Sequence, residues 1–284
     1  MSNEFTNDDF QSMISEMENE KNASTFKSPY WKPAAEGTYQ LRIITPLKQF
    51  GEKLFYEKHK MHYLGQRGYY CLNQTLKDKN GNVHEPEQCP ICAKSRALYN
   101  ASTKGTEEWD LAGKLRAKDR YVCRVIVRGK TTADGQDDET KPEFWEFGTK
   151  IHGYFFDQIK LGEAGNFLSL KDEGRDYNLV KKGSGRNTDY SGSCLSMKQT
   201  PIFTDVEKLK KLLEYLPKME YSQLVEFVSA DELKNALNDM LNGPAAAAVE
   251  ENNNISTTET VSVNPTTPAA EEKVEDIDAL LNMI

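Results

Sequence analysis

Residues 119–130, DRYVCRVIVRGK, form the stretch of sequence that decides the fold. Arg124 and Arg128 occupy even-numbered positions in this stretch. The odd-numbered positions hold the apolar side chains of Tyr121, Cys123, Val125 and Val127. Alternate residues of a strand point to opposite faces of a sheet, so the pattern predicts a strand with one apolar and one partly cationic face. Such a strand suits the wall of a groove that follows a phosphate backbone.

Further extended segments lie on both sides of this strand in the sequence. We expect strands in GTYQLRIITP (37–46), KLFYEKHKMHYL (53–64) and FWEFG (144–148), and two more around a turn at 172–176 in NFLSLKDEGRDYNLVKKGSG (166–185). Residues 93–100, 149–162, 205–216 and 229–243 indicate helices, and the last of these opens with a Ser229-x-x-Glu232 capping box. Strands first and helices later predict an α+β domain around a small, mostly antiparallel barrel or sheet.

Charge is distributed unevenly along the chain, whose net charge is −8. Residues 1–20 carry six acidic side chains and no Lys or Arg, and residues 243–284 carry eight acidic side chains and one lysine. Residues 21–130, in contrast, hold 21 basic and 10 acidic side chains, a balance of +11. A cationic region between two acidic ends indicates an anionic partner such as a nucleic acid.

Composition divides the chain into three regions. We expect an acidic N-terminal arm at 1–20, a core at 21–242 and an acidic tail at 243–284, which is too poor in apolar residues to fold and is predicted to be disordered. No segment approaches the roughly 18 apolar residues of a membrane span, and the N-terminus MSNEFTNDDF lacks a signal-peptide pattern. We therefore expect a cytoplasmic protein without a membrane partner.

Three of the five cysteines cluster, which favours a metal site over a disulfide framework. Cys89 and Cys92 have the Cys-x-x-Cys spacing that presents two thiolates to one zinc ion, and Cys71 is the natural third ligand. The fourth ligand should be a histidine, with His62 preferred, then His84, then His59. Four protein ligands close the coordination sphere, so the predicted zinc is structural; a redox pair of thiols is the alternative.

Cations and aromatic rings follow this cysteine cluster. Single-stranded bases can stack on exposed rings, whereas duplex bases cannot, and cations neutralise phosphates. Any of the rings could instead belong to the core, Tyr121 above all, because it alternates with apolar residues. The candidate DNA contacts are Tyr99, Trp109, Lys114, Arg116, Lys118, Arg120, Tyr121, Arg124 and Arg128.

The chain resembles the single-stranded DNA-binding, helix-destabilising proteins of T-even-type bacteriophages. The resemblance covers about residues 26–200 and is carried by HYLGQRGYYC, EQCPIC followed by SRALYN, KLRAKDRYVCRVIVRGK and FWEFGTKIHGYFFDQI. It implies an OB-fold core with a structural zinc subdomain and a basic, aromatic cleft for single-stranded DNA. We place the zinc subdomain at about 56–95, and the helices expected from the sequence pattern complete the core at about 205–242. By position, the family's zinc ligands match His62, Cys71, Cys89 and Cys92, and its cleft aromatics match Tyr99, Trp109 and Tyr121.

The resemblance also implies a function without catalysis. The family protects single strands and destabilises duplex during phage replication, recombination and repair, in the cytoplasm of the infected host. Its acidic C-terminus contacts replication and recombination proteins, and the matching residues of EEKVEDIDALLNMI here include Glu275, Asp276, Asp278, Leu280 and Leu281. We expect this tail to compete with DNA for the cationic region when no partner holds it.

Two departures from the family affect these expectations. The family's N-terminal arm is basic and supports self-association on DNA, whereas residues 1–20 here are acidic and the nearest basic stretch is KNASTFKS at 21–28. The loop between Cys71 and Cys89 is longer than in the family, which keeps His84 open as a ligand. The alternative functions are a zinc-dependent nuclease or deaminase and an RNA-binding regulator.

Overall fold

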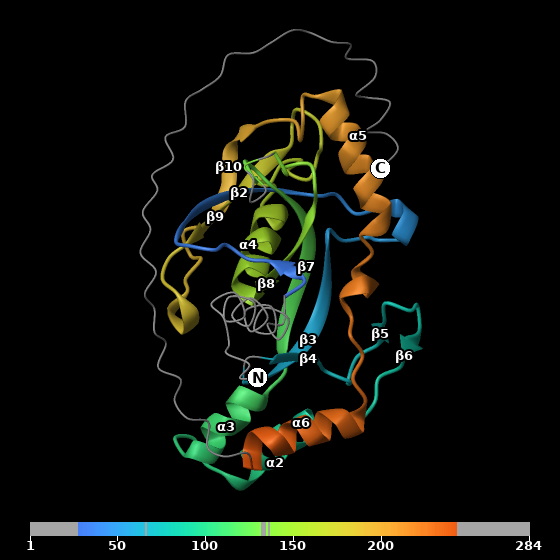
Figure 1. The fold of residues 1–284 in the computed structure, drawn as a ribbon. Helices are drawn as coiled ribbons and strands as arrows, with labels where there is room; N and C mark the ends of the chain where they lie inside the picture. Colours follow the sequence, from blue (N-terminus) through green and yellow to red (C-terminus); the bar gives the residue numbers. More distant parts are fainter. Residues whose placement is uncertain (1–27, 66, 132–134, 136, 243–284) are drawn as a thin grey trace, which may run out of the picture.

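The computed structural model describes residues 28–65, 67–131, 135 and 137–242 (Figure 1). The predictions for the acidic arm at 1–20 and for the tail at 243–284, including Glu275, Asp276, Asp278, Leu280 and Leu281, lie outside the described residues. Within the described part, no helix has both the length and the apolar character that a membrane crossing requires. The fold is mixed α+β, with a sheet-dominated core.

The strand predicted from DRYVCRVIVRGK is the centre of the sheet (Figure 1). It forms β7 (Lys118–Val127), and β8 (Glu143–Gly148) pairs antiparallel along one side of it. The other side is shared by two strands: β3 (Tyr56–Leu64) pairs with residues 118–123, and β2 (Gly37–Ile43) pairs with residues 125–127. One long strand therefore joins the two halves of the molecule.

Shorter strands extend the sheet from this centre. β1 (Tyr30–Trp31) runs parallel to β8, β9 (Arg175–Lys181) pairs with β2 and with β10 (Cys194–Gln199), and β4 (Arg67–Tyr70) pairs with β3. The main path runs β1-β8-β7-β2-β9-β10. No ladder among the described residues joins its two ends, so closure into an OB-type barrel stays a prediction.

β7 is covered on both faces, which corrects the expected cationic groove wall. Every residue from Tyr121 to Val127 is buried. One face packs against α4 (Thr149–Lys160) in a core that includes Cys123, Phe147 and Phe155. On the other face, Val122 packs with Phe144 and with η4 (Tyr221–Leu224). Arg124 and Arg128 therefore lie on a second face that packs against other parts of the fold, and not on a face exposed to solvent.

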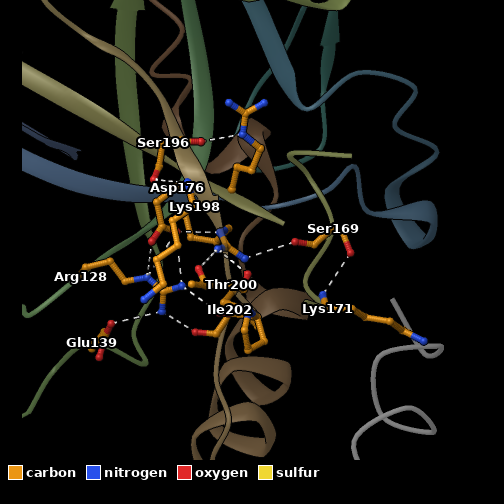
Figure 2. A network of polar contacts seen from close by, with 12 residues as sticks. Arg128, Glu139, Ser169, Lys171, Asp176, Ser196, Lys198, Thr200 and Ile202 are labelled. Carbon is orange, nitrogen blue, oxygen red and sulfur yellow. Dashed lines mark hydrogen bonds and ion pairs between the residues drawn. The ribbon is translucent and has the colours of Figure 1, made fainter. Parts of the chain in front are cut away.

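Arg128 belongs to a network of ion pairs that fixes the far end of β7 (Figure 2). Its guanidinium contacts Asp176 at 3.2 Å and Glu139 at 3.3 Å, and it donates to the Ile202 carbonyl. The fully buried Arg42 reaches the same Asp176 at 2.7 Å. Burial lowers the pKa of Arg42, and the Asp176 carboxylate opposes that effect. These contacts join β2, β9 and the end of β7, so the role of Arg128 is structural.

The remaining helices form two groups. At the lower end of Figure 1, α2 (Pro90–Ala101), α3 (Glu107–Leu115) and α6 (Ala230–Asn242) pack together beside the small β5–β6 sheet (Leu76–Lys77 and Val83–His84). At the other end lies α5 (Val206–Tyr215), which packs in a separate cluster with Ile126. Three further 3-10 turns are η1 (Lys48–Phe50), η2 (Gly185–Asn187) and η3 (Leu216–Lys218).

Local sequence signals are confirmed in some places and wrong in others. The capping box is confirmed, because Ser229 N donates to Glu232 Oε2 at 2.9 Å and Glu232 N donates to Ser229 Oγ at 3.4 Å. The strand expected before the turn at 172–176 is wrong, since residues 166–171 form turns that still bury Phe167 and Leu170. Helix α3 was not expected, although Thr106 caps it by accepting from Trp109 N.

Candidate functional site

A cluster of three cysteines and one histidine lies where β3, β4 and α2 meet. Cys71 follows β4, Cys89 is the residue just before α2, Cys92 lies in the first turn of α2 and His62 lies on β3. Their ligand atoms all lie within 4.8 Å of one another. Cys71 Sγ is 3.5 Å from Cys92 Sγ, and His62 Nε2 is 3.4 Å from the sulfurs of Cys89 and Cys92. The cluster could hold one metal ion.

The spacing within the cluster fits tetrahedral coordination. Metal–sulfur bonds of about 2.3 Å and metal–nitrogen bonds of about 2.0–2.1 Å place tetrahedral ligand atoms roughly 3.5–3.8 Å apart. His62 Nδ1 lies 2.7 Å from the Leu115 carbonyl, so this nitrogen carries the proton and Nε2 is left free to bind a metal. Hydrogen bonds from Cys71 and Cys92 lower the pKa of Cys89, which favours the thiolate that metals bind.

The two other candidate histidines lie elsewhere. His84 Nε2 contacts Asp78 Oδ2 at 3.0 Å, and the His84 ring stacks on Phe227 with a centroid separation of 3.6 Å. His59 is buried edge-on to Tyr70, and burial lowers its pKa to about 4. The geometry therefore favours His62, the first choice from the sequence, because His62 alone of these three contacts the cysteines.

A cationic hollow of about 970 Å³ opens beside the cysteine cluster; we call it the metal-side hollow. Cys71 and Cys92 are among its lining residues, as are the predicted contacts Tyr99, Arg116, Lys118 and Arg120. Arg96 and Lys60 add two cations that the sequence did not single out. In the part of the chain that the structure describes, no ion pair involves Lys60, Arg96, Arg116 or Lys118.

A second hollow of about 370 Å³ adjoins the first; we call it the aromatic hollow. Both are lined by Arg120, Gly148 and Thr149, so they adjoin at these residues, and we refer to the two hollows together as the groove. The partly exposed rings of the aromatic hollow belong to Trp31, Tyr154 and Tyr190. Sequence reasoning missed all three, although the polar surroundings of Trp31 (SPYWKP) and Tyr190 (NTDYSG) were a usable signal of surface rings.

Several predicted DNA contacts lie outside the groove lining. Tyr121 is only 5% exposed and its ring stacks on His152 with centroids 4.0 Å apart, so it belongs to the core. Arg124 is 1% exposed; it pairs with Glu52 at 2.6 Å and its guanidinium carbon lies 4.0 Å from the centroid of Tyr221. Burial of β7 on both faces explains why the predictions for Tyr121 and Arg124 are wrong. Arg128 follows β7, lines neither hollow and is held by its ion pairs with Asp176 and Glu139.

Trp109 and Lys114 border the groove without lining it. Trp109 packs edge-on against Tyr99, with centroids 4.7 Å apart, and therefore supports a ring that does line the metal-side hollow. Lys114 is exposed in the last turn of α3. The basic run thus starts on a helix and crosses to a strand, and its groove contacts are Arg116, Lys118 and Arg120.

A buried cluster of potential metal ligands beside a cationic groove with aromatic walls defines a class of nucleic-acid-binding protein. A family model described as gp32 DNA binding protein like matches residues 37–241, which is most of the chain. The chain belongs to this gp32-like family of single-stranded DNA-binding proteins. No curated protein gives a match. The family is non-enzymatic, and the match includes the cysteine cluster and almost all of the groove.

Proposed function

We propose that the protein binds single-stranded DNA without sequence specificity along the groove formed by the metal-side hollow and the aromatic hollow. The observation that carries the proposal is that the two hollows share Arg120 and Gly148, which places cations that form no ion pair among the described residues, such as Arg116 and Lys118, close to partly exposed rings. Cations neutralise phosphates, and stacking on rings is tolerant of base identity because every base has a π-face. Duplex bases are already stacked, so the aromatic hollow favours single strands.

We further propose that the metal is zinc and that its role is structural. Three sulfurs and one imidazole nitrogen are ligands that zinc prefers, and together they would complete its tetrahedral sphere. A bound zinc ion would cross-link β3, the residue after β4 and the start of α2. Because α2 carries Arg96 and Tyr99, this cross-link would hold one wall of the groove in place.

The finer functional assignments rest on family membership. We propose that the core is an OB-fold variant and that the protein covers and protects single strands, destabilising duplex, during phage replication, recombination and repair in the host cytoplasm. The tail, with Glu275, Asp276, Asp278, Leu280 and Leu281, would recruit replication and recombination proteins. Self-association on DNA would need contacts other than a basic N-terminus, because residues 1–20 are acidic.

One titration separates this function from its alternatives. Fluorescent oligonucleotides of one sequence, single-stranded and duplex, are titrated with the full chain, and the products are then run on a denaturing gel. We expect tight binding to the single strand, much weaker binding to the duplex and intact oligonucleotides. Cleavage or deamination would support a zinc-dependent enzyme, and stronger competition by RNA than by DNA of the same sequence would support an RNA-binding regulator.

A further inference from the structure

Arg120 stands where the two hollows of the groove join. It lines both, and its side chain is 29% exposed. A Cβ at position 148 would lie 3.2 Å from Arg120 Nη1, so the glycine leaves room for the guanidinium at this junction. A DNA strand that passes from the metal-side hollow to the aromatic hollow would have to pass this guanidinium.

Glu146 already holds this arginine. Arg120 Nη2 donates to Glu146 Oε2 at 2.6 Å, and the Glu146 side chain is 11% exposed and lines the aromatic hollow. The register places Arg120 opposite Gly148, so Arg120 and Glu146 are diagonal neighbours on one face of β7 and β8. Burial alone would lower the pKa of Arg120, but the hydrogen bond and the charge of Glu146 outweigh it and raise the pKa.

The other acidic side chains of the groove, Asp119 and Asp189, have different partners. Asp119 pairs with Lys58 at 2.8 Å, and Lys58 does not line either hollow. Asp189 accepts a hydrogen bond from Ser191 Oγ at 2.5 Å. Hydrogen bonds from Ser191 and the charge of Lys150, which also lines the aromatic hollow, lower the pKa of Asp189, but Lys150 and Asp189 form no ion pair among the described residues. Among the described groove residues, Glu146 is therefore the acid that forms an ion pair with one of the groove's own cations.

We infer that Glu146 competes with DNA phosphate for Arg120, and that it keeps the affinity and the salt dependence of the groove below what its cations alone would give. The inference rests on the proposed function. A phosphate that replaces Glu146 leaves a mostly buried carboxylate without its partner, and a phosphate that shares Arg120 lies close to a like charge. Both outcomes cost free energy that binding at Arg116 or Lys118 does not.

The test uses the full chain and Glu146→Gln, which keeps the side-chain length and an acceptor oxygen but removes the charge. Releasing Arg120 for one phosphate should steepen the slope of log K against log salt by about 0.7, which tightens single-stranded DNA binding about three- to five-fold at roughly 0.15 M salt. The matched control is Glu139→Gln, because Glu139 pairs with Arg128 outside both hollows. It makes the same charge change and should leave slope and affinity near those of the wild type.

A second variant shows that the gain depends on Arg120. In the Arg120→Gln/Glu146→Gln double variant the tightening should vanish, and thermal unfolding checks that each variant folds; Glu146→Met replaces Glu146→Gln if the latter does not. Unchanged or weaker binding by the folded single variant overturns the inference, and weaker binding would instead assign Glu146 the role of positioning Arg120. If the wild type fails to bind single-stranded DNA, the proposed function falls together with the inference.

Discussion

At the residue scale, the groove depends on rings that lie far apart in the sequence. Trp31 and Tyr190 line the same aromatic hollow, although one precedes the first long strand and the other follows β9. Their proximity depends on β1 pairing with β8 and on the loop after β9 reaching the same edge. No local pattern contains that information, whereas the neighbouring cations Arg116, Lys118 and Arg120 could be found from a single short stretch.

We predict that Tyr190→Ala weakens single-stranded DNA binding by about 1–3 kcal/mol, the usual loss when one stacked base loses its ring. The salt slope should stay unchanged, because no cation is removed. Tyr215→Ala is the matched control, since Tyr215 is 38% exposed on α5 and lines neither hollow. Fluorescence titration at two salt concentrations measures both quantities, and equal affinity for the two variants would exclude Tyr190 from the binding surface.

A second residue-scale prediction concerns acid stability. Burial lowers the pKa of His59 to about 4, and the unfolded chain protonates this histidine near pH 6.5. Between these values the unfolded state binds more protons, so the contribution of His59 to stability is complete above about pH 6.5 and is lost as the pH falls toward 4. The loss should reach about 3 kcal/mol.

The comparison for this prediction is His59→Phe, which cannot titrate. Urea unfolding at intervals from pH 7 to pH 4 should give a shallower decline for this variant than for the wild type. The wild type and the variant have the same carboxylates, so any difference between their pH profiles comes from position 59. An equal decline of the unfolding free energy in both would show that His59 does not control acid stability.

At the scale of elements, the sequence located most strands and helices but not their burial. Alternation in DRYVCRVIVRGK correctly placed β7, yet it could not show that the second face is also covered. That face is covered by η4, which lies about 100 residues later, and Arg124 is satisfied there by Glu52 and by the Met219 carbonyl. An arginine on a strand has the same sequence pattern whether it faces solvent or a buried carboxylate.

The cysteine spacing was more informative, because a metal site limits which side chains can meet. We predict that Cys71→Ser removes the metal, lowers the melting temperature and weakens single-stranded DNA binding, since the wall formed by α2 loses its cross-link. Elemental analysis should give one zinc per wild-type chain and none in the variant. Amide hydrogen exchange should increase mainly within residues 60–95.

The exposed-thiol control for this experiment is Cys194→Ser, because Cys194 is exposed on β10 and lies outside the cluster. It should keep the metal and the DNA affinity of the wild type. A wild-type chain that contains no zinc, or a Cys71→Ser variant that retains it, would contradict the assignment.

At the scale of the whole molecule, the net charge alone does not indicate an anionic partner. The net charge of −8 combines −6 from residues 1–20, −7 from residues 243–284 and −6 from residues 131–242 with +11 from residues 21–130. The amino-acid sequence is sufficient to reveal this arrangement, because the formal charge of a segment does not depend on the fold. The path of the groove could not be predicted in the same way, since it depends on how β3, β7 and β8 align.

We predict that deleting residues 243–284 tightens single-stranded DNA binding, most strongly at low salt. The deleted segment carries eight acidic side chains and one lysine, and its tether gives it a high local concentration near the groove. A variant that keeps the length but replaces the acidic residues with Gln or Asn should bind like the deletion. Unchanged affinity in both variants would show that the tail does not compete with DNA.

Binding of single-stranded DNA along the groove is tested most directly by the salt dependence of wild-type binding to a single-stranded oligonucleotide. In the described part of the chain, the groove cations without an ion-pair partner are Lys32, Lys60, Arg96, Arg116, Lys118 and Lys150. Each phosphate that these six cations neutralise contributes about 0.7 to the slope of log K against log salt, so we predict a slope of about −4. A slope near zero, or equal affinity for the duplex, would contradict this mode of binding.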